Sequence, residues 1–403
     1  MAVGPSRLRL SMSIEALYIH IPFCHAKCAY CDFDSRACRG AELERAAGAY
    51  VALLTERIDA FGAAGALAAV STVYIGGGTP TTLGTRLPEL VGRVRGWCDP
   101  VELTVEANPE SFDDAMAASL ARAGVTRISL GVQSFDDGEL AAIGRLHDAE
   151  GAKAALARAR ACGFDVSLDL MCGLPGQTAA SWENTLEHAL ACAPDHISVY
   201  PLTIEDGTPL ARRAEREPAL EPDEDFQAAC MERARDLFAA AGFSRYEVAS
   251  YALPGKACRH NRAYWTGVSY LGVGRSAASM LTAGEYRELS GLLGGRECAH
   301  GTARVRVVQR DDAGRTFDIE CLDAREAAAE DLMLAMRMAV GAPSALIERA
   351  RSVIGTAEVD RAIGTALAEG LARRDGASGT VAPTERGWLM GNELYGLMWD
   401  LAG

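Results

Sequence analysis

The sequence predicts an α/β protein in which six parallel strands form an open, partial barrel, followed by a small, mostly helical C-terminal domain. Short runs rich in β-branched and other apolar residues recur up to Pro201. Stretches with helical spacing separate them, and this alternation stops beyond Tyr251. Strands that alternate with helices are typical of βαβ units and a parallel sheet. A flat, doubly wound sheet is the second architecture that this pattern allows.

The individual elements follow from the same pattern. The expected strands are Ala16–Ile21, Ser71–Ile75, Val101–Glu106, Thr126–Val132, Asp165–Met171 and His196–Pro201. Several of the helices begin at Asp or Ser and end near Gly or Pro, which are ordinary helix boundaries. The expected helices are Ala41–Phe61, Arg86–Trp97, Asp113–Ala123, Asp148–Cys162, Ser181–Ala191 and Phe226–Ala241, the last one preceded by an acidic, solvated connection over Arg212–Asp225.

The C-terminal part predicts helices over Ala324–Gly341, Pro343–Ile354 and Val359–Glu369, then a Gly-rich turn at Asp375–Thr380. Helices followed by a small hairpin are typical of a winged-helix-like domain. Its acidic residues favour a packing module over a DNA-binding one. The chain therefore divides into a tail (1–15), a partial barrel (16–250), a linking region (251–323) and a helical domain (324–403).

Charge and hydropathy exclude several function classes. With 40 basic and 54 acidic side chains among 403 residues, the net charge is −14, which disfavours a nucleic-acid partner. The apolar runs are shorter than the roughly 20 residues that span a bilayer, and the N-terminus lacks a signal-peptide core. We therefore expect a cytoplasmic protein, at most peripheral to a membrane. Whether it is a monomer or a homodimer stays open.

The most specific motif is a group of three cysteines, Cys24, Cys28 and Cys31, spaced C-x3-C-x2-C in a loop after the first strand. Soft thiolates this close together can bind one metal centre. Because no fourth ligand sits at cluster spacing, a 4Fe–4S cubane with one open iron explains the motif better than a closed zinc site does. A zinc knuckle that borrows His20 or His25, or three buried cysteines, is the alternative.

This loop, placed after the first strand of an alternating β/α chain, resembles that of the radical S-adenosylmethionine (SAM) superfamily. The resemblance implies that the open iron binds SAM and that an electron from the cluster cleaves it to a 5′-deoxyadenosyl radical. The glycine run Gly76, Gly77, Gly78 with Thr79 after the second strand resembles the superfamily's glycine motif. Polar residues at the carboxyl ends of barrel strands form active sites. By resemblance the SAM site would also contain Glu106, Gln133, Arg145 (on the SAM carboxylate) and Asp169 (near the ribose).

Three further segments narrow the branch: Ile19–Phe23, Gly131–Ser134 and Asp169–Thr178. They are similar to the oxygen-independent coproporphyrinogen III oxidase-like proteins, and the match runs from about Leu17 to the C-terminus. This branch holds an oxidase class and a haem chaperone class. The oxidase usually has a fourth cysteine where this chain has Phe33, and it has a longer segment ahead of the cluster loop. Both differences favour the chaperone class.

The chaperone class carries an H-N-x-x-Y-W signature, which here reads from His260 through Tyr264 to Trp265. An imidazole can ligate haem iron, and aromatic faces can contact a macrocycle. Cys258 is an alternative thiolate ligand. Related chaperones often have a histidine where Ala278 stands, and the run Ser276–Met280 is closer to the oxidase pattern. The remaining cysteines are interpreted as small core residues: Cys38, Cys98, Cys162, Cys172, Cys192, Cys230, Cys298 and Cys321.

The sequence therefore supports two main hypotheses. The first is a haem-binding chaperone that passes haem to acceptor proteins, in particular membrane-bound respiratory ones. The second is an enzyme that converts coproporphyrinogen III to protoporphyrinogen IX with SAM as oxidant. A structural iron–sulfur or zinc protein without SAM is the third. The expected cofactors are a 4Fe–4S cluster, SAM and haem, and the expected small-molecule partner is haem or a porphyrin.

Overall fold

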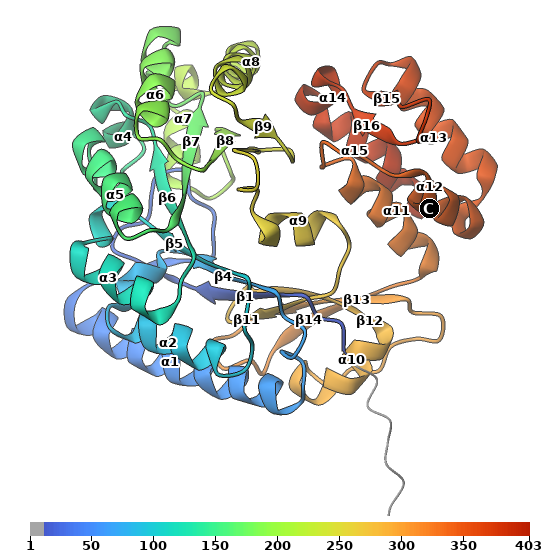
Figure 1. The fold of residues 1–403 in the computed structure, drawn as a ribbon, viewed down its shortest axis with the longest axis horizontal. Coiled ribbons are helices and arrows are strands. Elements are labelled where there is room, and N and C mark those ends of the chain that lie inside the picture. The colour runs from blue at the N-terminus through green and yellow to red at the C-terminus, as the bar shows by residue number, and fades with distance from the viewer. Residues whose placement is uncertain (1–11) are drawn as a thin grey trace, which may run out of the picture.

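The fold is built on one curved sheet of twelve strands, seen in a computed structural model that describes residues 12–403 (Figure 1). Its parallel centre contains the six expected strands, each within two residues of the predicted bounds. They are β1 (Ala16–Ile21), β4 (Thr72–Gly77), β5 (Glu102–Ala107), β6 (Arg127–Gln133), β7 (Asp165–Cys172) and β8 (His196–Pro201). The sheet does not close, because it ends in two edge strands. The predicted partial barrel is therefore confirmed.

Helices cover the convex face of this sheet (Figure 1). The expected ones are α1 (Gly40–Ala63), α2 (Arg86–Arg95), α3 (Asp114–Ala123), α5 (Ala149–Ala161), α6 (Ala179–Ala191) and α8 (Glu224–Ala240). The predicted starts at Asp113 and Asp148 are caps, since each side chain accepts a hydrogen bond from a backbone N–H of the first turn. The helix expected from Phe226 begins two residues earlier, after Asp223, which caps it in the same way. Two short helices, α4 (Asp137–Ala142) and α7 (Pro209–Ala214), were not expected.

The strands of the barrel alternate between an apolar outer face and a polar inner face. On β5, for example, Leu103 and Val105 pack under the helices, whereas Thr104 and Glu106 line cavities inside the barrel. The sequence analysis expected near-continuous apolar runs. The actual alternation arises because only the outer face meets helices, while the inner face surrounds a polar interior.

The region 251–323 completes the sheet rather than only linking two parts. It contributes β11 (Tyr270–Val273), which runs parallel to β1, and then three antiparallel strands, β12 (Ala278–Thr282), β13 (Arg304–Gln309) and β14 (Phe317–Leu322). It also contains α9 (Arg259–Trp265) and α10 (Ala283–Leu289). At the opposite edge lie β10 (Ser250–Ala252) and β9 (Ser244–Arg245). In Figure 1, α9 lies on the concave side of the sheet, where it faces the barrel interior.

The C-terminal part forms a second helical unit with its own apolar core. It consists of α11 (Ala324–Ala335), α12 (Ser344–Ile354), α13 (Thr356–Ala368), the hairpin β15 (Ala372–Arg374) and β16 (Val381–Pro383), α14 (Glu385–Leu389) and α15 (Gly391–Trp399). The first helix ends earlier than expected, at Ala335, where the chain turns. The hairpin encloses the predicted Gly-rich turn. The proposed boundaries at 250/251 and 323/324 remain predictions.

Smaller elements complete the description. A pair of two-residue strands, β2 (Phe23–Cys24) and β3 (Arg36–Ala37), brackets the cysteine loop, and short 3₁₀ turns occupy Pro80–Leu83, Pro109–Ser111, Pro218–Leu220, Ser290–Leu292 and Asp400–Ala402. Most of the predicted tail, residues 1–11, lies outside the described residues. None of the helices in residues 12–403 is both long enough and apolar enough to cross a membrane.

Candidate functional site

The three cysteines lie around one cavity at the carboxyl ends of the barrel strands. Cys24 is buried, and Cys28 and Cys31 are half-buried. The β2–β3 pairing closes the loop, and the N–H of Cys38 donates to the carbonyl of Cys24 at 2.9 Å. The cavity has a volume of about 150 Å³, and all three thiols line it together with the predicted Gly77–Thr79 turn.

The glycine run is a cradle that side chains would fill. A Cβ on Gly76 would lie 2.8 Å from the Glu106 carboxylate, and one on Gly77 would lie 2.5 Å from the His20 ring. On Gly78 a Cβ would lie 2.7 Å from the carbonyl oxygen of Phe23 and 3.0 Å from Cys24 Sγ. Gly77 also has a φ of 112°, which favours glycine. The strand β4 can therefore approach the thiols only because these positions lack side chains.

Two half-buried carboxyl groups, Glu106 and Asp169, lie next to the glycine run and line the same cavity. Glu106 accepts hydrogen bonds from the Tyr74 hydroxyl at 2.7 Å and from the Gly77 N–H at 2.9 Å. Burial raises the pKa of Glu106. Burial, and then the nearby Glu106 carboxylate, raise the pKa of Asp169 to about 7. The pair thus provides acceptors for hydroxyl and ammonium groups and can hold a proton at neutral pH.

Arg145 brings a positive charge to the same cavity. Its guanidinium donates to Cys28 Sγ at 3.4 Å and to Asn108 Oδ1 at 2.8 Å, and it also donates to the Gly131 carbonyl. Its Nε atom is buried and has no hydrogen-bond partner. The last predicted member, Gln133, also lines the cavity, at a β-bulge with a φ of 70°. The structure therefore brings the predicted cluster and SAM residues to one cavity, except Gly76, which does not line it.

These residues fit a 4Fe–4S cluster and SAM. Within residues 12–403, no three His, Cys, Asp or Glu side chains converge closely enough to hold a single metal ion. In a cubane each thiolate binds a different iron, so the sulfurs surround the cluster instead of converging on one point. The Arg145 guanidinium suits a carboxylate, and the Glu106 and Asp169 carboxyl groups suit the amino and hydroxyl groups of SAM.

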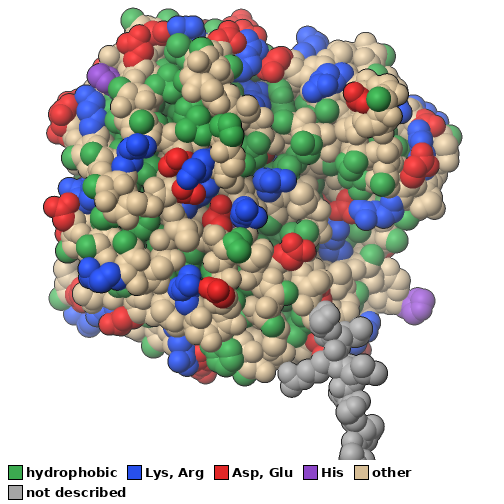
Figure 2. Space-filling model, in the orientation of Figure 1, with side chains coloured by type: hydrophobic (Ala, Val, Ile, Leu, Met, Phe, Trp, Pro, Cys, Tyr) green, Lys and Arg blue, Asp and Glu red, His purple; other side chains and the backbone are tan. Residues whose placement is uncertain are grey.

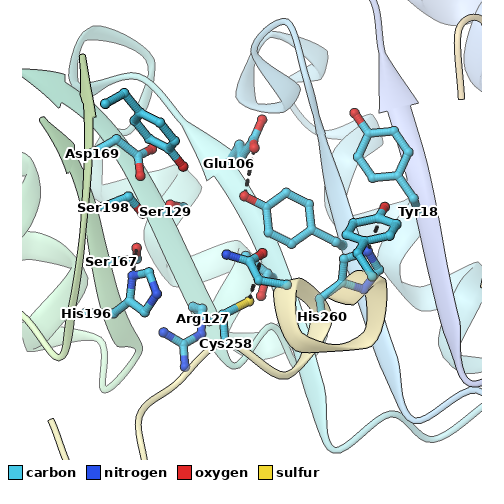
Figure 3. Close-up of a pocket in the computed structure, with 15 residues that line it drawn as sticks. Tyr18, Glu106, Arg127, Ser129, Ser167, Asp169, His196, Ser198, Cys258 and His260 are labelled. Carbon is cyan, nitrogen blue, oxygen red and sulfur yellow. Dashed lines mark hydrogen bonds between the residues drawn. The ribbon is translucent and has the colours of Figure 1, made fainter. Parts of the chain in front are cut away.

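A second cavity, of about 250 Å³, lies deeper in the barrel (Figure 3). It shares Glu106, Ser129 and Asp169 with the first. Its floor contains Arg127, which is 2% exposed, pairs with Glu102 at 3.5 Å and keeps two guanidinium nitrogens without partners. In Figure 3, His260 on α9 lies across the cavity from Ser167 and His196. The helix α9 therefore closes the polar interior of the barrel.

His260 and Tyr264 meet inside this second cavity. His260 is 1% exposed, and its Nδ1 and Nε2 atoms hydrogen-bond with the hydroxyls of Thr72 at 2.9 Å and Tyr264 at 3.2 Å. Burial lowers the pKa of His260 to about 3, so the ring is neutral. In this conformation neither nitrogen is free to bind iron.

Trp265 does not join His260 and Tyr264. Its indole N–H donates to Glu247 at 3.1 Å, and the guanidinium of Arg337 lies over its ring at 5.2 Å. Cys258 is buried beside Glu102, and burial raises the pKa of its thiol well above the usual range. The structure thus splits the predicted haem motif between the barrel interior and the boundary with the C-terminal unit.

Sequence reasoning missed several residues of the interior, above all Arg127 and His196. His196 hydrogen-bonds with Ser167 at 2.8 Å and with the Tyr246 hydroxyl at 2.9 Å. Both missed residues stand at strand starts, whereas the predicted site residues of the barrel stand at strand ends. The alternation of side chains along a strand could have identified them, because residues two apart lie on the same face. Arg127 shares a face of β6 with Ser129, and Ser167 shares a face of β7 with Asp169.

The fold and the cysteine cavity define a class of protein. A sequence profile described as the Radical SAM superfamily matches residues 18–189. Among solved structures, a coproporphyrinogen III oxidase (HemN) from Escherichia coli, titled a Radical SAM enzyme, superposes with a TM-score of 0.76. The superposition covers 97% of this chain and 91% of the oxidase at 22% sequence identity, which shows a shared fold.

Curated proteins narrow the class further. The chain is 35% identical to the heme chaperone HemW of Mycobacterium tuberculosis over 369 residues. This alignment covers 88% of this chain and 87% of that protein. The chain is also 39% identical over 272 residues to the heme chaperone HemW of Escherichia coli, covering 66% of this chain and 70% of that protein. The chain belongs to the HemW family of radical SAM proteins.

Proposed function

We propose that this chain is a haem chaperone, which binds haem and passes it to acceptor proteins of respiration. The observation that carries the proposal is the 35% identity, over 88% of the chain, to a protein named heme chaperone. Phe33 adds support, because it stands where the oxidase class usually has a fourth cysteine. Its side chain is 59% exposed and lines the cysteine cavity.

The size of the barrel interior also favours a chaperone over an oxidase. The second cavity measures about 250 Å³, and α9 covers it. Sites for drug-sized ligands measure about 300–1,000 Å³, and coproporphyrinogen III is a complete tetrapyrrole with four propionates. A substrate of that size does not fit in the second cavity in this conformation.

We propose that the haem contact is the α9 segment with His260, Tyr264 and Trp265. A neutral imidazole is the form that ligates iron, and burial keeps His260 neutral. Since both ring nitrogens are engaged, ligation requires α9 to turn out of the barrel so that the bond between Nδ1 and Thr72 on β4 opens. The buried Cys258 thiol is a poorer candidate, because iron binds the thiolate and burial raises the pKa of this thiol.

The cysteine cavity belongs to the proposal as the site of a 4Fe–4S cluster and SAM. When bound, the pair supplies one-electron chemistry. Cys24, Cys28 and Cys31 would hold the cluster, and Arg145 with the two half-buried carboxyl groups would orient SAM.

We place the protein in the cytoplasm, where it would meet membrane-bound acceptors from the aqueous side. Figure 2 shows acidic and basic side chains scattered among one another over the face in view. The net charge of −14 supports a partner other than a nucleic acid.

A haem titration tests the proposed contact. The wild-type protein should develop a Soret band with one haem per chain. His260→Ala should shift or abolish this band, because the axial imidazole is lost. The matched control is His300→Ala, which removes an exposed histidine far along the chain and should leave the spectrum unchanged. An unchanged spectrum in His260→Ala would remove His260 from the haem site.

The oxidase alternative is tested separately. Anaerobic, cluster-loaded protein is incubated with a low-potential reductant, SAM and coproporphyrinogen III, and the products are separated by chromatography. We expect no protoporphyrinogen from a preparation that binds haem. Formation of protoporphyrinogen together with 5′-deoxyadenosine would instead establish the oxidase.

A further inference from the structure

Two cysteines far apart in the sequence meet at one edge of the sheet. Cys321 lies on the edge strand β14, and Cys298 lies 23 residues earlier, in the segment 293–303 that leads into β13. Their Sγ atoms are 3.0 Å apart, which is closer than ordinary van der Waals contact between sulfurs. Sequence analysis had interpreted each as an isolated core residue. The structure instead makes them a pair.

The surrounding contacts hold this pair together. The Tyr286 hydroxyl on α10 donates to the carbonyl of Arg296 at 2.9 Å, and the Arg296 guanidinium donates to the carbonyl of Ile319 on β14 at 3.0 Å. The segment 293–303 is thus fixed to β14 two residues before Cys298. Little backbone movement separates the two thiols from bonding distance, which is about 2.05 Å in a disulfide.

The pair is also accessible from solvent. Both thiols are half-buried rather than enclosed. Cys298 lines a surface cavity of about 780 Å³ together with Arg287, Arg296 and His300. A cavity of this size admits a small peptide disulfide. Its two guanidinium groups outnumber its one carboxylate, Glu297, and so favour an anionic ligand. Neither thiol belongs to the cysteine cavity at the barrel mouth.

We propose that Cys298 and Cys321 form a reversible intramolecular disulfide, with a small anionic disulfide such as oxidised glutathione as the oxidant. The thiolate of one cysteine attacks the small disulfide, forms a mixed disulfide and releases one glutathione thiol. The thiolate of the other cysteine then displaces the second glutathione. Two electrons pass to the oxidant, and the two protons end on the two released thiols.

The disulfide would link the segment 293–303 to the edge strand β14, which pairs with β13 alone. Cys321 stands two residues before Asp323, which caps α11 through the N–H of Glu326. The oxidised bond therefore lies where the sheet leads into the C-terminal unit. Burial raises the pKa of Cys298 to about 11, so the reaction should be slow at neutral pH and accelerate as the pH rises.

The test treats cluster-loaded protein anaerobically with a glutathione redox buffer, alkylates the remaining thiols and maps the peptides by mass spectrometry. We expect a peptide pair joined through Cys298 and Cys321, two hydrogens lighter than the free peptides, that dithiothreitol separates. Cys298→Ser and Cys321→Ser should each abolish it. Cys162→Ser, which alters another half-buried cysteine, should not. The visible cluster absorption, recorded throughout, should not change.

Two results would overturn the proposal. One is an oxidised protein whose only modification is glutathione attached to Cys298, because the pair would then fail to close. The other is a midpoint of thermal unfolding that oxidation raises equally in wild type and in Cys298→Ser. We expect the increase in wild type alone, since only there can the segment be fastened.

Discussion

Gly78 is the glycine of the run that packs directly against the cysteine loop. An added Cβ would meet both the carbonyl oxygen of Phe23 and the sulfur of Cys24. We predict that Gly78→Ala forces the loop and β4 apart, lowers the iron and sulfide content and costs about 1–3 kcal/mol of unfolding free energy, as overpacking does. Iron and sulfide analysis after anaerobic reconstitution measures the first effect.

The matched control for that substitution is Gly92→Ala. Gly92 is an exposed glycine of α2 with open space where a Cβ would stand. An alanine there should keep the full cluster content and stabilise the helix by about 0.5–1 kcal/mol. Equal cluster content in both variants would show that the glycine run does not position the thiols.

His260 gives a pH prediction whose sign follows from burial. Its folded-state pKa is lowered to about 3 from an ordinary value of 6.5, so the unfolded chain binds the proton more tightly. The stability contributed by neutral His260 is therefore present above pH 6.5 and is lost as the pH falls toward 3. Between about pH 7.5 and pH 5.5, wild type should lose roughly 1 kcal/mol more than His260→Gln, measured by denaturant unfolding.

The comparison with His260→Gln isolates the contribution of this histidine to the pH dependence of stability. His196, the other histidine whose pKa burial lowers to about 3, is present in both proteins and cancels in the difference. If the two proteins lose stability in parallel, the His260 ring is protonated in the folded state and does not lie in the closed interior.

At the level of residues, the sequence predicted the cysteine cavity well and the deeper cavity poorly. Motif spacing identified the thiols, and strand ends identified Glu106 and Asp169, because parallel strands end at one edge. Arg127 and His196 escaped notice because polar residues at strand starts usually stabilise the fold. The split between His260 and Trp265 also could not be predicted, since a hexapeptide does not reveal which face of its helix turns inward.

Among the elements, the contact between β13 and α11 depends on a cluster of ion pairs. Glu330, whose side chain is 4% exposed, pairs with Arg304 at 3.0 Å and also with Arg306. Asp331 pairs with Arg304 at 2.8 Å and with Arg349 at 2.9 Å. The acidic residues that sequence analysis interpreted as a packing feature thus connect the sheet to the C-terminal unit.

We predict that Glu330→Ala costs about 3 kcal/mol, because it leaves two guanidinium groups without their buried partner. Glu348→Ala on α12 is the control. Its carboxylate is 67% exposed and pairs with Arg351, so its loss should cost less than about 1 kcal/mol. Thermal unfolding of both variants measures the difference, and similar values would mean that the cluster does not fasten the two units.

The central elements could be predicted because long helices and buried strands have strong patterns, and Asp caps marked several helix starts. The strands of the region 251–323 could not be predicted from the sequence. β13 alternates arginine with valine, the pattern of a half-buried antiparallel strand, which differs from the near-continuous apolar run expected of a buried parallel one. β11 has only four residues and gains its place by pairing with β1.

At the scale of the whole molecule, the radical SAM barrel has one polar interior, and His260 and Tyr264 of α9 face into it. The barrel supplies the cysteine cavity at its mouth, and α9 closes the polar space beneath it. This arrangement explains how a chain can share its fold with a coproporphyrinogen III oxidase and still serve a different function. His260 and Tyr264 of α9 line this space, which in the present conformation is smaller than a tetrapyrrole.

The most direct test of this account is a haem-transfer measurement. Haem-loaded wild-type protein is mixed with a haem-free b-type cytochrome domain, and the acceptor's Soret band is followed over time. We predict that haem passes to the acceptor, and that His260→Ala, which should fail to hold haem, supplies none beyond the rate seen with free haem. Haem that stays on the wild-type protein, or transfer that His260→Ala performs equally well, would contradict the central claim.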